Sequence, residues 1–392
     1  MAHLSQWPLL QLLLLCWAVG RLLLALLPAG EPGGGRIGDG LLVQATSFCL
    51  GWLAMEAQGR LLGFFGMEWT LWMQLIPWGI VLGFWWLALP GRIVPRHGVQ
   101  HDPAGGIGKW AARLGLALCL LTILLRARVD QSGNFSGQAA HVLLEIVALV
   151  VSVEILGVLR IHGLVKGLVL LLGGAVILVH EHSPVDLERA PLLAALAVGL
   201  LGALTWARRA DRRGRLLCAL IALLLCAQGV AGCCAAVALC GSLLAGTTPV
   251  RIKQTDGSIL RQFWGWIFQP LREVAPALGL AALVFSRELD QAGDTQVMPL
   301  FSGALVLLGL AAVWRTKAGN RGPGRMGIYE ARLLWAQPAI LMACTALIPL
   351  APPLNTLLMM PALLGLAAAL IAPLEPGALT PPRTTTNGVP AG

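Results

Sequence analysis

Residues 139–159 decide the fold, and they read AAHVLLEIVALVVSVEILGVL. Almost all of these side chains are apolar, and the run has about the 20 residues that a helix needs to cross the hydrocarbon core of a bilayer. Comparable apolar runs recur along the whole chain. This pattern predicts a protein built from helices that cross a membrane.

The composition of the whole chain agrees with this interpretation. Of the 392 residues, 57% are hydrophobic and only 12% are charged. An ordinary soluble domain carries about 25% charged residues, so this chain lacks the polar side chains to cover a water-facing surface. Intrinsic disorder is excluded as well, because its signature is low hydrophobicity with high charge. The expected fold class is all-α, a polytopic helical membrane protein.

About 11 spans are predicted within a single transmembrane domain, residues 1–373. A stretch rich in aromatic residues near 258–275 is expected to lie in the membrane interface, and one full crossing there would raise the count to about 12. The tail, residues 374–392, is rich in Pro, Thr and Gly and is expected to be disordered. The spans are placed near 7–27, 41–58, 68–89, 110–126, 139–159, 164–180, 191–207, 216–245, 296–314, 333–350 and 354–372. In the long run 216–245, Gly229 and Gly232 could break or tilt the helix.

The distribution of Lys and Arg predicts the orientation. One set of alternate loops is rich in basic residues, among them Lys109, Arg160 and the cluster in 208–215, whereas the other set holds few, such as Arg126 and Arg128. The positive-inside rule places the rich set in the cytoplasm, so the N-terminus is expected outside and the C-terminus inside. The net charge of +9 then points to anionic lipid head groups as partners, and not to nucleic acid. A bacterial inner (plasma) membrane is the predicted location.

Ionisable residues in the middle of an apolar helix are the candidate functional residues, because burying them is costly unless a cavity or a partner meets them. Glu145 and Glu154 each lie about 6–8 Å from the centre of their run, and on opposite faces of the helix. His141 precedes Glu145 by one turn, and Lys166 in the next run returns to a depth close to that of Glu154. These four residues are predicted to form a proton relay. The alternative is a buried Glu154–Lys166 ion pair that only fixes helix register or docks another subunit.

The sequence predicts no catalytic residue, no metal site and no bound cofactor. A G-x-S-x-G motif is missing, and the nine cysteines include no C-x-x-C pair, which argues against a hydrolase, a zinc site or an iron–sulfur cluster. One alternative stays open: His141 and His180, both predicted near the outer membrane face, could ligate a b-type haem. Glu56 and Glu68 flank the second predicted turn and are expected at the membrane interface.

Three segments resemble the antiporter-like, proton-channel subunits of respiratory complex I, Mrp antiporters and membrane-bound hydrogenases. Residues 143–149 (LLEIVAL) are similar to the Glu-bearing helix of that family, and residues 166–174 (KGLVLLLGG) to its following Lys-containing helix. Residues 212–220 (RRGRLLCAL) resemble the basic start of a later helix. The chain departs from the family in lacking its P-x-H-x-W-L-P-D motif and in having fewer spans. The resemblance implies a Glu145/Lys166 relay that is coupled to other subunits.

The function expected from the sequence is that of an integral membrane subunit in a multi-subunit energy-converting complex. The subunit would conduct protons, or pack beside the conductor, through Glu145, Glu154 and Lys166. Independent catalytic activity is not expected, although the complex could be a proton-translocating oxidoreductase. The alternatives are a secondary transporter with a central cavity and a purely structural assembly subunit. Other membrane subunits are the expected protein partners.

Overall fold

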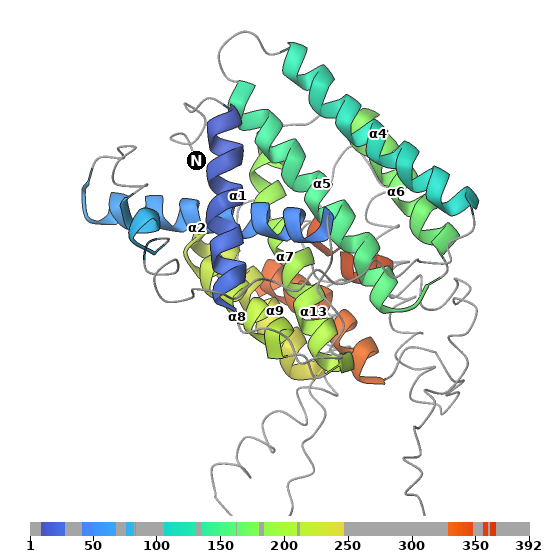
Figure 1. The fold of residues 1–392 in the computed structure, drawn as a ribbon. Coiled ribbons are helices and arrows are strands. Elements are labelled where there is room, and N and C mark those ends of the chain that lie inside the picture. The colour runs from blue at the N-terminus through green and yellow to red at the C-terminus, as the bar shows by residue number, and fades with distance from the viewer. Residues whose placement is uncertain are drawn as a thin grey trace, which may run out of the picture.

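The computed structural model describes the greater part of the first 250 residues and two shorter stretches near the C-terminus. All regular secondary structure in these residues is helical, and no strand occurs among them (Figure 1). The predicted all-α class is therefore confirmed for this part of the chain. The described residues are 9–27, 41–67, 76–81, 83, 106–129, 135–161, 163–179, 184–209, 212–246, 328–347, 356–359 and 361–365.

Among the described residues, three helical segments are long and apolar enough to cross a membrane: Ala139–Val158, Arg189–Ala207 and Gly229–Gly246. Leu13–Leu26 and Gly163–Leu178 are shorter apolar segments. The total of about 11 spans and the orientation stay predictions, and 258–275, 296–314 and 374–392 lie outside the described residues. The elements are α1 (Leu9–Leu26), α2 (Leu41–Phe64), α4 (Gly106–Val129), α5 (Phe135–Val158), α6 (Gly163–Val179), α7 (Pro184–Arg209), α8 (Arg212–Cys226), α9 (Gly229–Gly246), α13 (Ile328–Leu347) and the short 3₁₀ helix η2 (Thr356–Met359).

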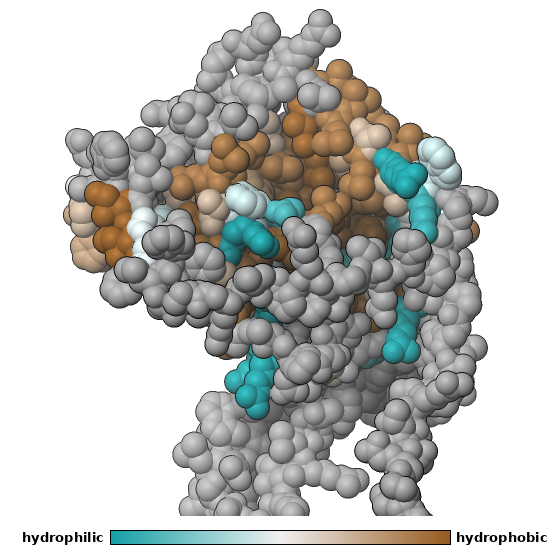
Figure 2. All heavy atoms as spheres, viewed as in Figure 1, coloured by the Kyte–Doolittle hydropathy of each residue, from teal (hydrophilic) through white to brown (hydrophobic). Residues whose placement is uncertain are grey.

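Helices α4 and α6 form a close pair along one side of the molecule (Figure 1). A Cβ added at Gly108 would lie 3.0 Å from the carbonyl oxygen of Gly163, and one added at Gly174 would lie 2.7 Å from that of Gly115. The contact therefore advances toward the C-terminus on both helices, so the two run in the same direction. Small residues at the contact let the backbones approach this closely. Apolar side chains gather on the surface over this pair (Figure 2).

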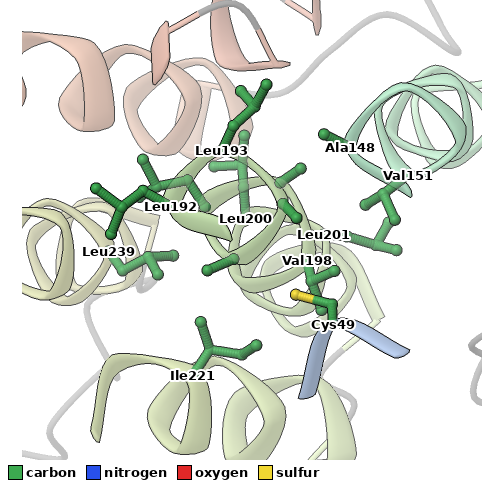
Figure 3. Packing of buried hydrophobic residues seen from close by; sticks show 14 of the residues in the cluster. Cys49, Ala148, Val151, Leu192, Leu193, Val198, Leu200, Leu201, Ile221 and Leu239 are labelled. Carbon is green, nitrogen blue, oxygen red and sulfur yellow. The ribbon is translucent and has the colours of Figure 1, made fainter. Parts of the chain in front are cut away.

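Helix α7 is the centre of the core. Of its apolar segment Arg189–Ala207, 89% is buried, and it contacts α2, α5, α8, α9 and α13. In Figure 3, the leucine and valine side chains of α7 meet Val151 on α5, Leu239 on α9, Ile221 on α8 and Cys49 on α2. This helix is thus surrounded by protein, which explains why it can be apolar on every face.

The run 216–245, predicted as one long span, is in fact two helices. Helix α8 ends at Cys226 and α9 begins at Gly229, which has a φ of 81°. A Cβ at Gly232 would collide with the carbonyl oxygen of Leu225, although residues seven apart in a straight helix are about 10 Å apart along its axis. The chain therefore folds back on itself, and α8 and α9 pack as a hairpin. The predicted break at Gly229 is confirmed and the single span is wrong, because a residue with positive φ ends the helix here.

Helix α2 runs across α1, α5 and α7, and not alongside them (Figure 1). Its crossing with α1 is made by two glycines. A Cβ at Gly20 would collide with the carbonyl oxygen of Ser47, and one at Gly51 with that of Cys16. The two backbones therefore touch at the crossing point, which only residues without a side chain permit.

Candidate functional site

Glu145, the central residue of the predicted relay, is buried in the protein interior. Only 8% of its surface is exposed, because α5 is enclosed by α1, α2, α4, α6 and α7. Leu144 and Ile146, its neighbours along the helix, are buried as well. The carboxyl group thus lies among other helices of the same chain.

His141 faces α2 from the turn of α5 that precedes Glu145. Its imidazole ring lies edge-on to the indole of Trp52, with ring centroids 5.4 Å apart. Trp52 is buried on α2, so the crossing of α2 over α5 is what positions this histidine. The predicted spacing of one turn between His141 and Glu145 holds in the helix.

Glu154 and Lys166 lie at the opposite end of α5. Glu154 is about one turn before the end of α5 at Val158, and Lys166 is about one turn after the start of α6 at Gly163. Both side chains are half-buried, and the two helices pack against each other. The prediction that the two residues share one end of this helix pair is therefore confirmed, whereas their ion pair stays a prediction.

The four predicted relay residues therefore form two groups, and not one cluster. His141 lies beside α2 with Glu145 one turn further along α5, while Glu154 and Lys166 lie near the turn between α5 and α6. Along α5 the two glutamates are separated by about 13 Å, from the rise of 1.5 Å per residue. Direct hydrogen bonds cannot cover this distance.

The haem site that the sequence leaves open lies partly outside the described residues. His180, the second residue of the possible haem site, lies outside the described residues. Within the described part of the chain, no group of three or more His, Cys, Asp or Glu side chains comes together in a way that could hold a metal ion.

A second buried carboxylate is Glu56 on α2, which is covered by protein, while its expected place at the membrane interface stays a prediction. Glu56 is only 4% exposed. Arg60 Nη2, one turn later on α2, lies 3.1 Å from Glu56 Oε1. With its amide nitrogen facing the carboxylate, Gln228 donates to Oε1 at 2.7 Å and to Oε2 at 3.0 Å. Charge-assisted hydrogen bonds of this kind are what a buried carboxylate requires.

The Glu56 cluster joins α2 to the turn of the α8–α9 hairpin. Gln228 immediately precedes Gly229, and a Cβ at Gly229 would lie 3.5 Å from Arg60 Nη1, so the guanidinium group lies over the turn. The spacing of Glu56 and Arg60, four residues apart, is a sequence signal for a helical ion pair. Nothing in the sequence links either residue to Gln228, because that contact depends on how distant helices pack.

Searches with the chain against protein-family models, curated proteins and solved structures return no match.

Proposed function

We propose that the protein is an integral subunit of a multi-subunit, energy-converting complex in the bacterial inner membrane, and that it conducts protons through His141, Glu145, Glu154 and Lys166. The observation that carries this proposal is the burial of Glu145 within Ala139–Val158, a segment apolar and long enough to cross a bilayer. By the helical rise, Glu145 lies about 5 Å from the middle of that segment. Acids at such depth are rare and are typical of proton pathways.

The order of the four residues supports the same proposal. His141 lies near the start of the apolar segment, Glu145 near its middle, and Glu154 with Lys166 toward its end. Titratable groups at successive depths are what proton transfer across a membrane needs. The gap of about 13 Å between Glu145 and Glu154 requires water or a side chain from elsewhere. A neighbouring subunit would supply this side chain, which favours a subunit of a complex over an independent pump.

A structural role is the second candidate, and the Glu56 cluster favours it. There a buried carboxylate accepts hydrogen bonds from Arg60 and Gln228 and holds two parts of the fold together. The predicted Glu154–Lys166 ion pair would act in the same way, as a device that fixes helix register.

The Glu145→Gln variant distinguishes the two candidates, because glutamine keeps the shape of the side chain and cannot release a proton. The protein is purified with the subunits that accompany it in mild detergent and is reconstituted into vesicles that contain a pH-sensitive dye. We expect the proton flux per assembled complex to fall by at least about tenfold, since a positioned proton-transfer group contributes that much or more.

The matched control is Glu56→Gln, which neutralises another buried acid, on α2. It is expected to lower the yield of the complex and to leave the flux per assembled complex unchanged. Unchanged flux in Glu145→Gln would remove the relay, and reduced assembly in the same variant would then support the structural role.

A further inference from the structure

Basic side chains gather at one end of the α4/α6 pair. Lys109 and Arg113 are exposed on the first turns of α4, and Arg160 is exposed just before α6 begins. Because Gly108 lies against Gly163, as described above, the start of α4 and the turn before α6 are at the same end of the pair.

Within the part of the chain that the structure describes, no acidic side chain pairs with these three charges. The sequences of α4 and α6 contain no Asp or Glu. Among the described residues, no ion pair or side-chain hydrogen bond holds Lys109, Arg113 or Arg160. Along the chain, the nearest acids are Asp102, which lies outside the described residues, and Glu154 on α5, which is half-buried beside Gly157. Among the described helices, the end of the pair is therefore a positive surface without a paired acid, which fits an anion.

Trp110 gives this surface the character of a membrane interface. Its indole is 70% exposed, and the guanidinium carbon of Arg113 lies 5.6 Å from the ring centroid. A cation–π contact at this distance holds the charge near the ring. Exposed tryptophan at the end of an apolar helix is typical of residues at the level of lipid head groups.

An exposed apolar stripe continues from the basic end along both helices (Figure 2). On α4 it runs from Trp110 through Leu114 to Leu125 at intervals of four or seven residues, which keeps it on one side of the helix. From Leu114 to Leu125 the stripe is about 16 Å long by the helical rise, close to the half-thickness of a bilayer core of about 30 Å. Its exposed members are Leu114, Leu121, Leu125, Leu168, Leu172 and Val176.

We propose that this end of the α4/α6 pair is a binding site for an anionic phospholipid. The lipid phosphate lies between Lys109, Arg113 and Arg160, and its acyl chains lie along the apolar stripe. Arginine binds phosphate through paired hydrogen bonds, and anionic lipids are concentrated in the cytoplasmic leaflet, where the Lys109 and Arg160 loops are predicted. The site rests on the proposed membrane location but does not depend on proton conduction.

The test measures how much lipid the purified full-length protein retains. Protein in mild detergent is equilibrated with phosphatidylglycerol and phosphatidylcholine that have the same acyl chains, and the bound lipids are counted by native mass spectrometry. The double variant Lys109→Gln/Arg113→Gln is compared with Arg126→Gln/Arg128→Gln, which removes the same charge from the other end of α4. Lys109→Arg, which keeps the charge, checks that substitution at this site is tolerated.

We expect the wild type to prefer phosphatidylglycerol. Retention should fall about fivefold for each charge removed, hence about 25-fold in the Lys109/Arg113 variant, and less than about twofold in the Arg126/Arg128 variant, because those charges lie far from the proposed phosphate. Lys109→Arg should bind like the wild type. Equal binding of the two lipids by the wild type would overturn the proposal, and so would equal losses in both double variants.

Carbonate extraction of the membranes separates the failure of this site from the failure of the proposed function. A protein without membrane spans would be recovered in the supernatant. A protein that lacks only the lipid site would stay in the membrane fraction and lose its preference for phosphatidylglycerol.

Discussion

Arg160 and Gly66 have the same structural role with very different side chains. Each lies just after a helix, with a φ of 59° for Arg160 and 67° for Gly66. In both cases the residue's N–H bonds to the carbonyl three residues earlier, and the next N–H bonds to the carbonyl five residues earlier. This is the Schellman motif, in which glycine is usual because a Cβ is strained at positive φ. Arg160 therefore carries a local strain that Gly66 does not.

Reciprocal substitutions at these two caps should change stability in opposite directions. Arg160→Gly is expected to stabilise the protein by about 1 kcal/mol, and Gly66→Ala to destabilise it by about as much. No atom lies within 4 Å of a Cβ at Gly66, so that penalty comes from the backbone alone. Thermal unfolding in a neutral detergent without added lipid measures both, and it excludes any effect of the lost arginine on lipid binding. Destabilisation by Arg160→Gly would show that its side chain, and not its backbone, matters for the cap.

At the scale of elements, the contact of α1 with α2 depends on two glycines, which have no side chain to keep the backbones apart. Gly20 and Gly51 bring two backbones into contact where α2 crosses α1. A helix interior is otherwise an unfavourable place for glycine, by about 1 kcal/mol relative to alanine. The close packing of the two backbones offsets this cost. Helix α2 in turn positions Trp52 against His141 and Glu56 against Gln228.

Alanine substitutions within α2 should separate the effect of close packing at the crossing from the intrinsic cost of glycine in a helix. Gly51→Ala is expected to cost about 3 kcal/mol, because its methyl group would collide with the backbone of α1 and force the helices apart. Gly63→Ala, in the same helix, meets no atom within 4 Å and is expected to stabilise the protein by about 0.5 kcal/mol. Thermal unfolding of the two variants provides the measurement. Equal effects would contradict the close crossing.

At the scale of the whole molecule, the α8–α9 hairpin changes the path of the chain. A single span over 216–245 would carry the chain from one side of the membrane to the other. A hairpin instead returns it to the side from which it started. If both arms of the hairpin lie in the membrane, Gly246 at the end of α9 is expected on the same side as Arg212 at the start of α8.

Labelling from one side of the membrane tests the hairpin. Single cysteines at Arg212, which is exposed at the start of α8, and at Thr248, two residues after α9, are treated with a membrane-impermeant maleimide in sealed vesicles. The native cysteines are first replaced by alanine or serine. We expect both positions to react from the same side and neither from the other. Reaction from opposite sides would restore the single span.

The sequence by itself determined the helical class and the places of several helices. Residues 139–159 and 191–207 were predicted as apolar helices, and the structure has apolar helices at Ala139–Val158 and Arg189–Ala207. This worked because a helix satisfies its backbone hydrogen bonds within its own run, and because hydropathy is a sum over the same run. Both properties are local, so the order of residues is enough to read them.

Only the tertiary structure decided which polar groups meet. The burial of Glu56 against Gln228 and the contact of His141 with Trp52 both depend on how helices pack. Gly229 and Gly232 marked a break in the sequence, but the direction of the chain after the break was set by the contact between α8 and α9. Contacts between residues far apart in the chain come from side-chain shape and close approach of backbones, which no single run of sequence contains.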